Sequence, residues 1–173
     1  MAERMWAPWR YKYLEQPVPS DPTTERGCIF VDLPAQSRDR DNLILFRGKK
    51  AFVMFNAYPY SNGHLMIAPY QHTGEIGELD DGALLEINQL LADCVRWLRK
   101  AYAPAGFNIG VNLGKAAGAG IPDHVHWHIV PRWAGDTNFM TTIAETRVLP
   151  QSLADAYDRL KEIIDQESAH DRT

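Results

Sequence analysis

The chain has 173 residues, 45% of them hydrophobic and 23% charged, with a formal net charge of −4. This composition suits a single globular domain with a sizeable core, and the negative charge argues against a general nucleic-acid-binding surface, which depends on a basic field. The sequence contains no apolar run of about 20 residues for a membrane helix, no secretory signal and only two cysteines. We expect a cytoplasmic protein without membrane or nucleic-acid partners.

Residues 1–27 form an aromatic arm among prolines, with rings at Trp6, Trp9, Tyr11 and Tyr13. Such rings usually pack against their own domain or a second subunit, because each buries a large area. Residues 36–42 are polar and indicate a solvated turn. Apolar runs separated by glycines then predict three strands, at residues 43–46, 51–55 and 64–68.

A long helix is predicted over residues 80–102, because acidic residues suit its start and apolar residues recur every three or four positions. Its apolar stripe consists of Leu84, Ile87, Leu91, Val95 and Leu98, widened by Leu85 and Trp97. Two strands follow at residues 107–113 and 125–131, and a terminal helix starts near residue 150. Strands joined by hairpins, with one helix between the third and the fourth, predict an α+β fold on an antiparallel five-stranded sheet.

Three histidines alternate at His124, His126 and His128. Successive side chains of a strand point to opposite faces, so these three imidazoles should share one face. Imidazole can ligate a metal, shuttle protons or attack an electrophile, and the triplet alone does not choose among these chemistries. Residues 106–120, just upstream, are rich in glycine and alanine, which lets a polyanion approach the backbone closely. We therefore expect a phosphate group over the imidazoles.

The triplet resembles the signature of the histidine-triad superfamily of nucleotidyl hydrolases and transferases, His-x-His-x-His followed by two apolar residues, here His124 to Val130. Residues 56–72 resemble the nucleoside-binding half of that family. Residues 5–10 and 131–133 look most like its bacterial branch associated with diadenosine polyphosphates. The resemblance implies a histidine-triad fold in which the sheets of two subunits join in a homodimer. It divides the chain into the arm at 1–27, a nucleotide-binding domain at 28–150, and a C-terminal helix and tail at 151–173.

The resemblance also implies roles for the three histidines. His126 would be the nucleophile and become transiently nucleotidylated. His128 would contact phosphate and help to set protonation, and His124 would support the nucleophile by hydrogen bonding or ligate zinc. A nucleophilic imidazole needs an acceptor for its second ring nitrogen, and we expect a backbone carbonyl from the loop before Gly118 to serve.

The nucleotide-binding residues that we expect are Asn56, His64, Asn112, Lys115 and Gly118. By resemblance, Asn56 would bond the ribose and His64 would line the nucleoside pocket. Asn112 alternates with Val111, so it can lie on the face of the triad and reach the phosphate. Lys115 and Arg132 are cations near the triad that could meet the polyphosphate. Apolar walls around the base are expected from Ile29, Phe30, Leu43 and Val53.

A structural zinc site is a second feature of many relatives, in which Cys-x-x-Cys and two histidines ligate the metal. This chain has Val31 where the second cysteine would stand, so the residual candidates are Cys28, His72 and His124. Asp32 could supply a fourth ligand. Structural zinc sites need a full tetrahedral set, so we expect no bound zinc and no required cofactor.

These observations together predict an enzyme with a small nucleotide substrate. We expect cleavage of a diadenosine polyphosphate, such as diadenosine tetraphosphate, at the α-phosphorus, with the nucleotidyl group passed to water or inorganic phosphate. One alternative is the hydrolysis of nucleoside phosphoramidates or acyl adenylates. The others are a metal-dependent hydrolase that uses the three histidines as ligands, and a nucleotide-binding module without catalysis.

Overall fold

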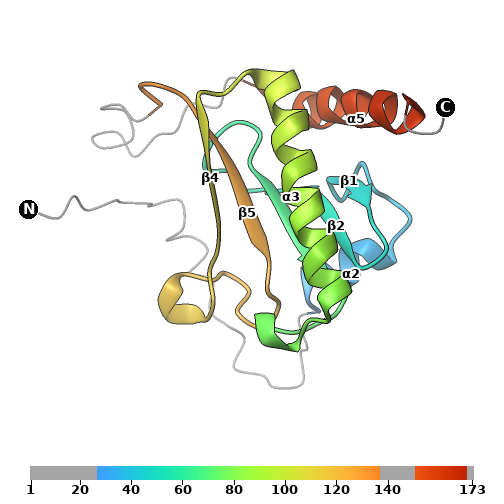
Figure 1. Cartoon of the computed structure of the whole chain (residues 1–173), viewed down its shortest axis with the longest axis vertical. Helices are drawn as coiled ribbons and strands as arrows, with labels where there is room; N and C mark the ends of the chain where they lie inside the picture. Colours follow the sequence, from blue (N-terminus) through green and yellow to red (C-terminus); the bar gives the residue numbers. More distant parts are fainter. Residues whose placement is uncertain (1–26, 137–150, 171–173) are drawn as a thin grey trace, which may run out of the picture.

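The computed structural model describes residues 27–136 and 151–170, so the predicted aromatic arm lies outside the described residues except for Gly27. Five strands form one antiparallel sheet with the order β1-β2-β3-β5-β4 (Figure 1). The strands are β1 (Ile44–Arg47), β2 (Ala51–Phe55), β3 (Leu65–Pro69), β4 (Gly106–Val111) and β5 (Trp127–Arg132). The predicted α+β class and five-stranded antiparallel sheet are therefore confirmed.

The two long helices cover one face of the sheet, and a short helix lies against the other (Figure 1). The long ones are α3 (Asp81–Tyr102) and α5 (Leu153–His170), and the short one is α2 (Ile29–Ala35). The described residues also include two single turns of 3₁₀ helix, η1 (Ile76–Glu78) and η2 (Lys115–Ala117). The helix α2 was not predicted, because a seven-residue helix that contains Pro34 shows no helical periodicity and holds its shape only through packing.

The predicted helix over residues 80–102 is confirmed as α3. Asp80 caps it by accepting a hydrogen bond from the backbone N–H of Ala83, and Ala103 ends it in the left-handed conformation with φ +45°. Its buried side includes Ile87, Cys94 and Leu98, which pack on the sheet. Trp97 belongs to that buried side too. The expectation that it widens an outer apolar surface was wrong, because α5 covers it and Glu167 accepts a hydrogen bond from its indole.

The sheet separates two hydrophobic clusters. Val53 of β2 points into the larger one, between the sheet and the helices α3 and α5, whereas Phe52 and Met54 point into the smaller one beneath α2. This is the period-two alternation of a strand that is buried on both faces. Phe30 of α2 fills the smaller cluster, so α2 closes that face of the sheet.

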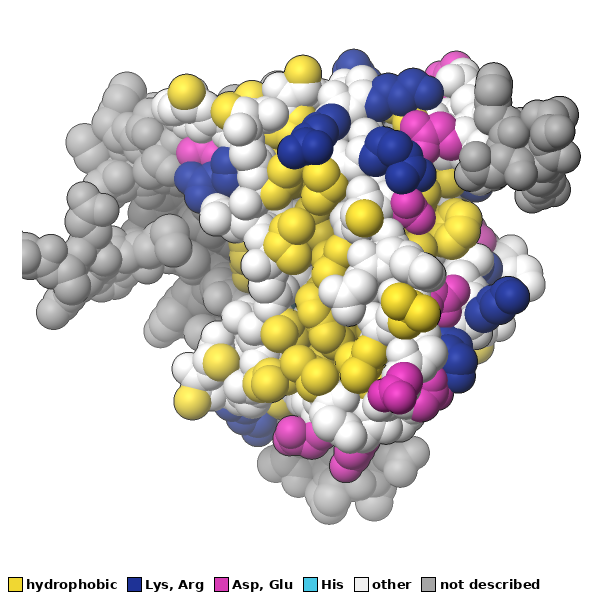
Figure 2. Space-filling model, viewed as in Figure 1, with side chains coloured by type: hydrophobic (Ala, Val, Ile, Leu, Met, Phe, Trp, Pro, Cys, Tyr) yellow, Lys and Arg dark blue, Asp and Glu magenta, His cyan; other side chains and the backbone are white. Residues whose placement is uncertain are grey.

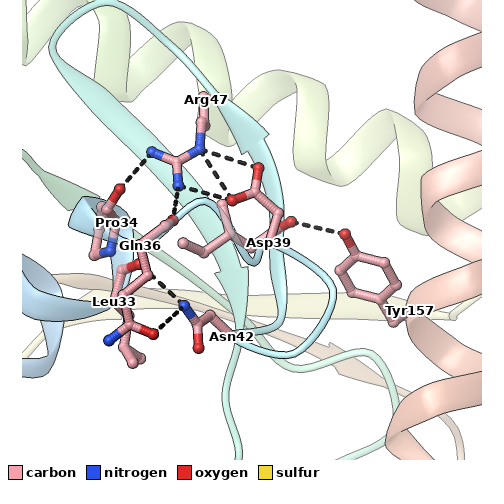
Figure 3. Close-up of polar contacts among 8 residues, drawn as sticks. Leu33, Pro34, Gln36, Asp39, Asn42, Arg47 and Tyr157 are labelled. Carbon is pink, nitrogen blue, oxygen red and sulfur yellow. Dashed lines mark hydrogen bonds and ion pairs between the residues drawn. The ribbon is translucent and has the colours of Figure 1, made fainter.

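Residues 36–43 connect α2 to the sheet and are tied down by polar contacts (Figure 3). The Arg47 guanidinium donates to the Asp39 carboxylate and to the carbonyls of Pro34 and Gln36. Asn42 is buried and donates to the carbonyl of Leu33, so the expectation of a fully solvated turn was wrong at this residue. These bonds fix where α2 lies relative to β1.

The bounds of several elements differ from the predicted ones by one to three residues. The fifth strand begins at Trp127 rather than at residue 125, and the fourth ends at Val111 rather than at residue 113. In the third strand the prediction stopped before Pro69, which the structure includes. The terminal helix begins at Leu153 rather than near residue 150. Within the described ranges, no helix is both long and apolar enough to cross a membrane.

Candidate active site

The three alternating histidines meet at the entry to β5. His128 belongs to the strand, whereas His124 and His126 lie in the extended segment before it. The His126 and His128 ring centroids lie 4.9 Å apart, and the ring of Phe30 lies 4.7 Å from that of His126. The residues that alternate with the three histidines point into the larger cluster on the other face of the sheet; they are Val125, Trp127 and Ile129. The prediction that the three imidazoles share one face is confirmed.

The surroundings of His126, the expected nucleophile, hold its ring in one neutral form. Its Nδ1 lies 2.8 Å from the main-chain oxygen of His124, and because a carbonyl can only accept, Nδ1 carries the hydrogen. The lone pair is therefore on Nε2. Burial lowers the pKa of His126, which keeps the ring unprotonated at neutral pH. The acceptor was expected from the loop before Gly118; that expectation was wrong, because the bond closes locally, two residues back along the chain.

His124 contacts His126 through this carbonyl, whereas its ring bonds elsewhere. Its ring is completely buried, and Nε2 donates to the carbonyl of Pro69 at 2.9 Å. Nδ1 is left as the bare nitrogen, 3.2 Å from the Cys28 thiol sulfur. Burial lowers the pKa of His124 to about 4, with smaller contributions from the neighbouring rings of His72 and His126. His124 thus behaves as a neutral anchor of the segment.

The lowered pKa of His124 predicts acid sensitivity of the fold. Unfolding restores its ordinary pKa of 6.5, so the unfolded chain binds the proton more tightly and stability falls as the pH drops from 6.5 towards 4. Between pH 7.5 and pH 5, the free energy of unfolding should decrease by about 2 kcal/mol from this residue. Urea titrations at the two pH values measure it, and His124→Gln, which does not titrate, should reduce the decrease. Equal pH dependence in both proteins would contradict the assignment.

The other expected nucleotide-binding residues surround the triad to different degrees. Gly110 of β4 pairs with His128 of β5. Asn112 stands two residues after Gly110, just beyond the end of β4, so it has the parity of the triad face that the prediction requires. Asn56 lies beside His64 and accepts a hydrogen bond from the N–H of Tyr58. His64 is fully buried, with its Nε2 3.0 Å from Nδ1 of His128.

The glycine-rich loop and the nearby cations are arranged as follows. Lys115 is exposed at the start of η2. Gly118 adopts φ +88°, which favours glycine, and its N–H donates to the carbonyl of Lys115 inside the turn. Arg132 lies at the end of β5, the strand that carries His128. Its guanidinium donates to the Asp136 carboxylate and to the side-chain oxygen of Asn108, so other protein groups hold it.

The expected walls of the base pocket divide between the two faces of the sheet. Phe30 lies on the triad face against the histidines. Val53 and Leu43 pack into the larger cluster on the opposite face, and Ile29 is 41% exposed on the outer side of α2. The expectation for Val53 was wrong for a reason visible in the sequence, since Phe52 and Met54 are the β2 residues with the parity of the triad face.

Three potential zinc ligands gather beside the triad. The donor atoms of Cys28, His72 and His124 lie within 4.8 Å of one another. His124 donates its second ring N–H to a carbonyl, as zinc-ligating histidines commonly do. Val31, in the place of a fourth ligand, has an aliphatic side chain that is 40% exposed, and Asp32 is not part of the cluster. The described residues therefore provide three donors and do not complete a closed tetrahedral set.

The alternative of a metal-dependent hydrolase that uses the three histidines as ligands loses support here. The potential metal cluster in the described part of the chain includes His124 but neither His126 nor His128, so the three histidines do not form a joint ligand set.

A hollow in the surface lies apart from the three histidines. It has a volume of about 410 Å³ and is lined by Pro34, Ser37, Asp39 and Arg47. It lies at the β1 edge, three strands away from β5, and its arginine is already engaged by Asp39.

Residues 37–135, more than half of the chain, match the family model of the HIT domain, and the chain belongs to this family. Its relatives include the AP-4-A phosphorylase of Mycobacterium tuberculosis, which is 40% identical over 156 residues that cover 88% of this chain and 80% of that protein. This match confirms the resemblance to histidine-triad proteins that the sequence motifs indicated.

Solved structures of histidine-triad proteins share the fold. A zinc-bound family member from Mycobacterium smegmatis superposes with a TM-score of 0.60 at 20% identity, covering 74% of this chain and 87% of that chain. A hypothetical histidine triad nucleotide-binding protein from Sulfolobus tokodaii gives 0.59 at 23% identity, covering 80% and 90%. At these identities, the likeness concerns the fold alone.

Proposed function

We propose that this chain is an enzyme that cleaves diadenosine polyphosphates, such as diadenosine tetraphosphate, at the α-phosphorus. The observation that carries the proposal is the His126 imidazole, which is neutral, buried and fixed with its lone pair on Nε2. The 40% identity to an AP-4-A phosphorylase over most of the chain supports this substrate class. A module that only binds nucleotides has no use for a nucleophile oriented in this way.

In the first step, Nε2 of His126 attacks the α-phosphorus, a P–N bond forms, and the P–O bond to the rest of the polyphosphate breaks. The imidazole becomes positively charged as this bond forms. The carbonyl of His124, which accepts the Nδ1–H hydrogen bond at 2.8 Å, stabilises that charge. His128 lies edge-on to His126 and would contact the phosphate oxygens.

In the second step, an acceptor oxygen attacks the same phosphorus and releases His126. Water as the acceptor gives a nucleoside monophosphate, and inorganic phosphate gives a nucleoside diphosphate. With diadenosine tetraphosphate, the leaving group of the first step is ATP in both cases. The acceptor thus determines whether the enzyme is a hydrolase or a phosphorylase. We propose that Lys115, Asn112 and the loop at Gly118 lie near the polyphosphate and the incoming acceptor, and that Asn56 binds the ribose.

Product analysis tests the proposed reaction. Purified protein is incubated with diadenosine tetraphosphate in phosphate-free buffer and in buffer with inorganic phosphate, and the nucleotides are separated by chromatography. We expect ATP in both reactions, with AMP or ADP as the partner product according to the acceptor. Two ADP molecules in phosphate-free buffer would mean symmetric cleavage and would contradict attack at the α-phosphorus. Faster turnover of adenosine phosphoramidate would favour the alternative substrate class.

We further propose that the enzyme needs no metal ion, because Val31 leaves three donors at the potential zinc site. Elemental analysis of the purified protein should find less than one zinc per chain, and a chelator should leave the melting temperature unchanged. The reason is that a structural zinc site stabilises a fold only with its full ligand set. Stoichiometric zinc that is lost together with the structure on chelation would overturn this prediction.

The final part of the proposal is a homodimer in which two sheets meet along β4. In the described residues β4 is the end strand of the sheet. Ile109 in β4 and Leu113 just after it are 47% and 44% exposed. On α3, Leu84, Leu91 and Val95 are half-buried apolar residues. Hydrophobic side chains gather on the face of the molecule in which α3 and β4 lie (Figure 2). An exposed edge strand flanked by apolar side chains is typically covered, and a two-fold contact is the commonest way to cover it.

Sedimentation velocity at micromolar concentration should therefore detect a dimer. Ile109→Lys should shift the protein towards the monomer, because it places a charge in the proposed contact. Lys49→Glu, an exposed charge change beside β1 at the opposite edge of the sheet, serves as a control that should leave the dimer intact. A single monomeric species in the unmodified protein would refute the proposed assembly.

A further inference from the structure

Arg132 is a cation that the sheet carries on the same face as the three histidines. It stands four residues after His128 in β5, so its side chain leaves the strand on the triad face. In β4, Asn108 pairs with Val130 and Gly110 pairs with His128. Directly paired residues point to the same face of a sheet, so these positions form one continuous surface between the triad and Arg132.

The guanidinium of Arg132 is turned back along the strand towards the histidines. Its Nη1 donates to the side-chain oxygen of Asn108 at 2.6 Å. Since Asn108 pairs with Val130, this contact places the guanidinium near the level of Val130, two residues from His128. Two residues of a strand advance about 7 Å, so the positive charge lies within reach of a polyphosphate whose α-phosphorus is at His126.

The surface between the guanidinium and the triad is left open by a glycine. Gly110 stands opposite His128, and a Cβ added to it would meet no heavy atom of the described residues within 4 Å. Its φ is not positive, so the backbone does not require a glycine there. A glycine in a strand is less stable than an alanine. Its effect here is that a ligand can pass close to the backbone beside His128.

Asp136 holds the guanidinium through the contacts that a phosphate group would make. Its two carboxylate oxygens accept from Nε and Nη2 of Arg132 at 2.5 and 2.8 Å. A tight turn brings the carboxylate there, because the N–H of Asp136 donates to the carbonyl of Trp133 and Gly135 adopts φ +76°. The planar fork of an arginine binds carboxylate and phosphate in the same two-bond manner. A phosphate group can therefore take the place of Asp136.

We propose that Arg132 binds a phosphate group beyond the α-phosphate and that Asp136 competes with this phosphate for the guanidinium. The inference deepens the function proposed above and rests on it for the direction in which the substrate lies. The chain has a formal net charge of −4, so a polyphosphate needs a local cation, and β5 supplies one in Arg132. The site then favours nucleotides with several phosphates over nucleoside phosphoramidates, which carry a single phosphorus.

The first measurement compares the affinities for ATP and AMP, which differ only in the phosphates beyond the α-phosphate. Isothermal titration of the full chain with His126→Ala keeps both nucleotides intact. In this background, Arg132→Ala should lower the ratio of ATP affinity to AMP affinity about 10-fold, the effect of one lost pair of charge-assisted hydrogen bonds. Asp136→Asn should raise the ratio, because a neutral amide competes less well for the guanidinium. An unchanged ratio in Arg132→Ala would overturn the phosphate contact, and an unchanged ratio in Asp136→Asn would overturn the competition.

Arg40→Ala is the matched control. Arg40 makes the same kind of two-bond ion pair with Asp158, in which Nε and Nη2 donate at 3.0 and 2.7 Å. It lies just before β1, at the opposite edge of the sheet from β4. The control removes the same charge and the same type of contact, so it should leave the ratio of ATP affinity to AMP affinity unchanged. An equal fall of the ratio in Arg40→Ala and Arg132→Ala would mean a general charge effect and would overturn the inference.

The second measurement is kinetic and separates this inference from the proposed function. Arg132→Ala should lower kcat/KM for diadenosine tetraphosphate about 10-fold more than for adenosine phosphoramidate, which has no phosphate beyond the first. Equal losses for the two substrates would contradict the contact. If the unmodified protein cleaves neither substrate but ATP binds through Arg132, the proposed function fails and the phosphate site stands. If it cleaves diadenosine tetraphosphate and Arg132→Ala leaves the ratio of ATP affinity to AMP affinity unchanged, the phosphate site fails and the function stands.

Discussion

Replacing His126 with alanine should lower kcat for cleavage of diadenosine tetraphosphate by about 10³-fold or more, because the covalent route through a P–N bond disappears. The residue sits at the centre of the site with its lone pair on Nε2. The fold should survive, since the loss is one ring in contact with Phe30 and His128. Steady-state kinetics and the melting temperature of the variant measure the two effects separately.

His126→Asn is the matched control for this experiment. Its amide can still donate towards the carbonyl of His124, so it preserves the local hydrogen bond and removes only the nucleophile. We expect it to be as inactive as the alanine variant. Mass spectrometry of rapidly quenched unmodified enzyme should find one nucleotidyl group on the chain, and neither variant should carry it. Turnover near the unmodified level in either variant would refute the covalent mechanism.

Of the substitutions proposed for this protein, Phe30→Ala should lower the free energy of unfolding most, by about 3–5 kcal/mol, as expected for truncating a fully buried aromatic ring. Phe30 is 1% exposed and packs on Phe52, His124 and His126. The helix α2 has seven residues and depends on this anchor, because so short a helix is not stable alone. Natural domains have a stability of about 5–15 kcal/mol, so the variant would be close to unfolding.

Ile29→Ala on the same helix is the control, because its side chain is 41% exposed and should cost less than about 1 kcal/mol. Urea unfolding curves of the two variants and the unmodified protein give the comparison. We expect turnover to fall in Phe30→Ala even under conditions in which it is folded, because the ring holds the segment before β5 in place. A loss below about 1 kcal/mol in Phe30→Ala would show that α2 is not anchored by this side chain.

The fold and the centre of the site could be predicted because they rest on regular patterns. The alternation of His124, His126 and His128 identified one strand face, and the recurrence of apolar residues identified α3. Both signals depend on the period of a strand or a helix, which the sequence displays directly. The resemblance in residues 56–72 pointed to His64, which the structure places against His128. The expected cytoplasmic location rests on the sequence alone and stays a prediction.

Features that depend on tertiary contacts could not be predicted in the same way. The helix α2 forms around Phe30, whose partners come from strands and loops far along the chain. The acceptor for His126 is the carbonyl two residues back, which follows from the path of an irregular segment rather than from any residue type. The burial of Trp97 depends on α5, which begins more than 50 residues later. The wrong wall assignment of Val53 is different, since strand parity alone would have corrected it.

The strand order places the site across a seam between two halves of the chain. The strands β1 to β3 are sequential neighbours, and β4 and β5 form a second local pair, so both groups need only short-range pairing. The halves join through three residue pairs of β3 and β5, including Met66 with His128. Pairing across so long a stretch of chain is slow compared with local pairing. During refolding, the return of activity should therefore report the docking of the two halves, later than the return of secondary structure.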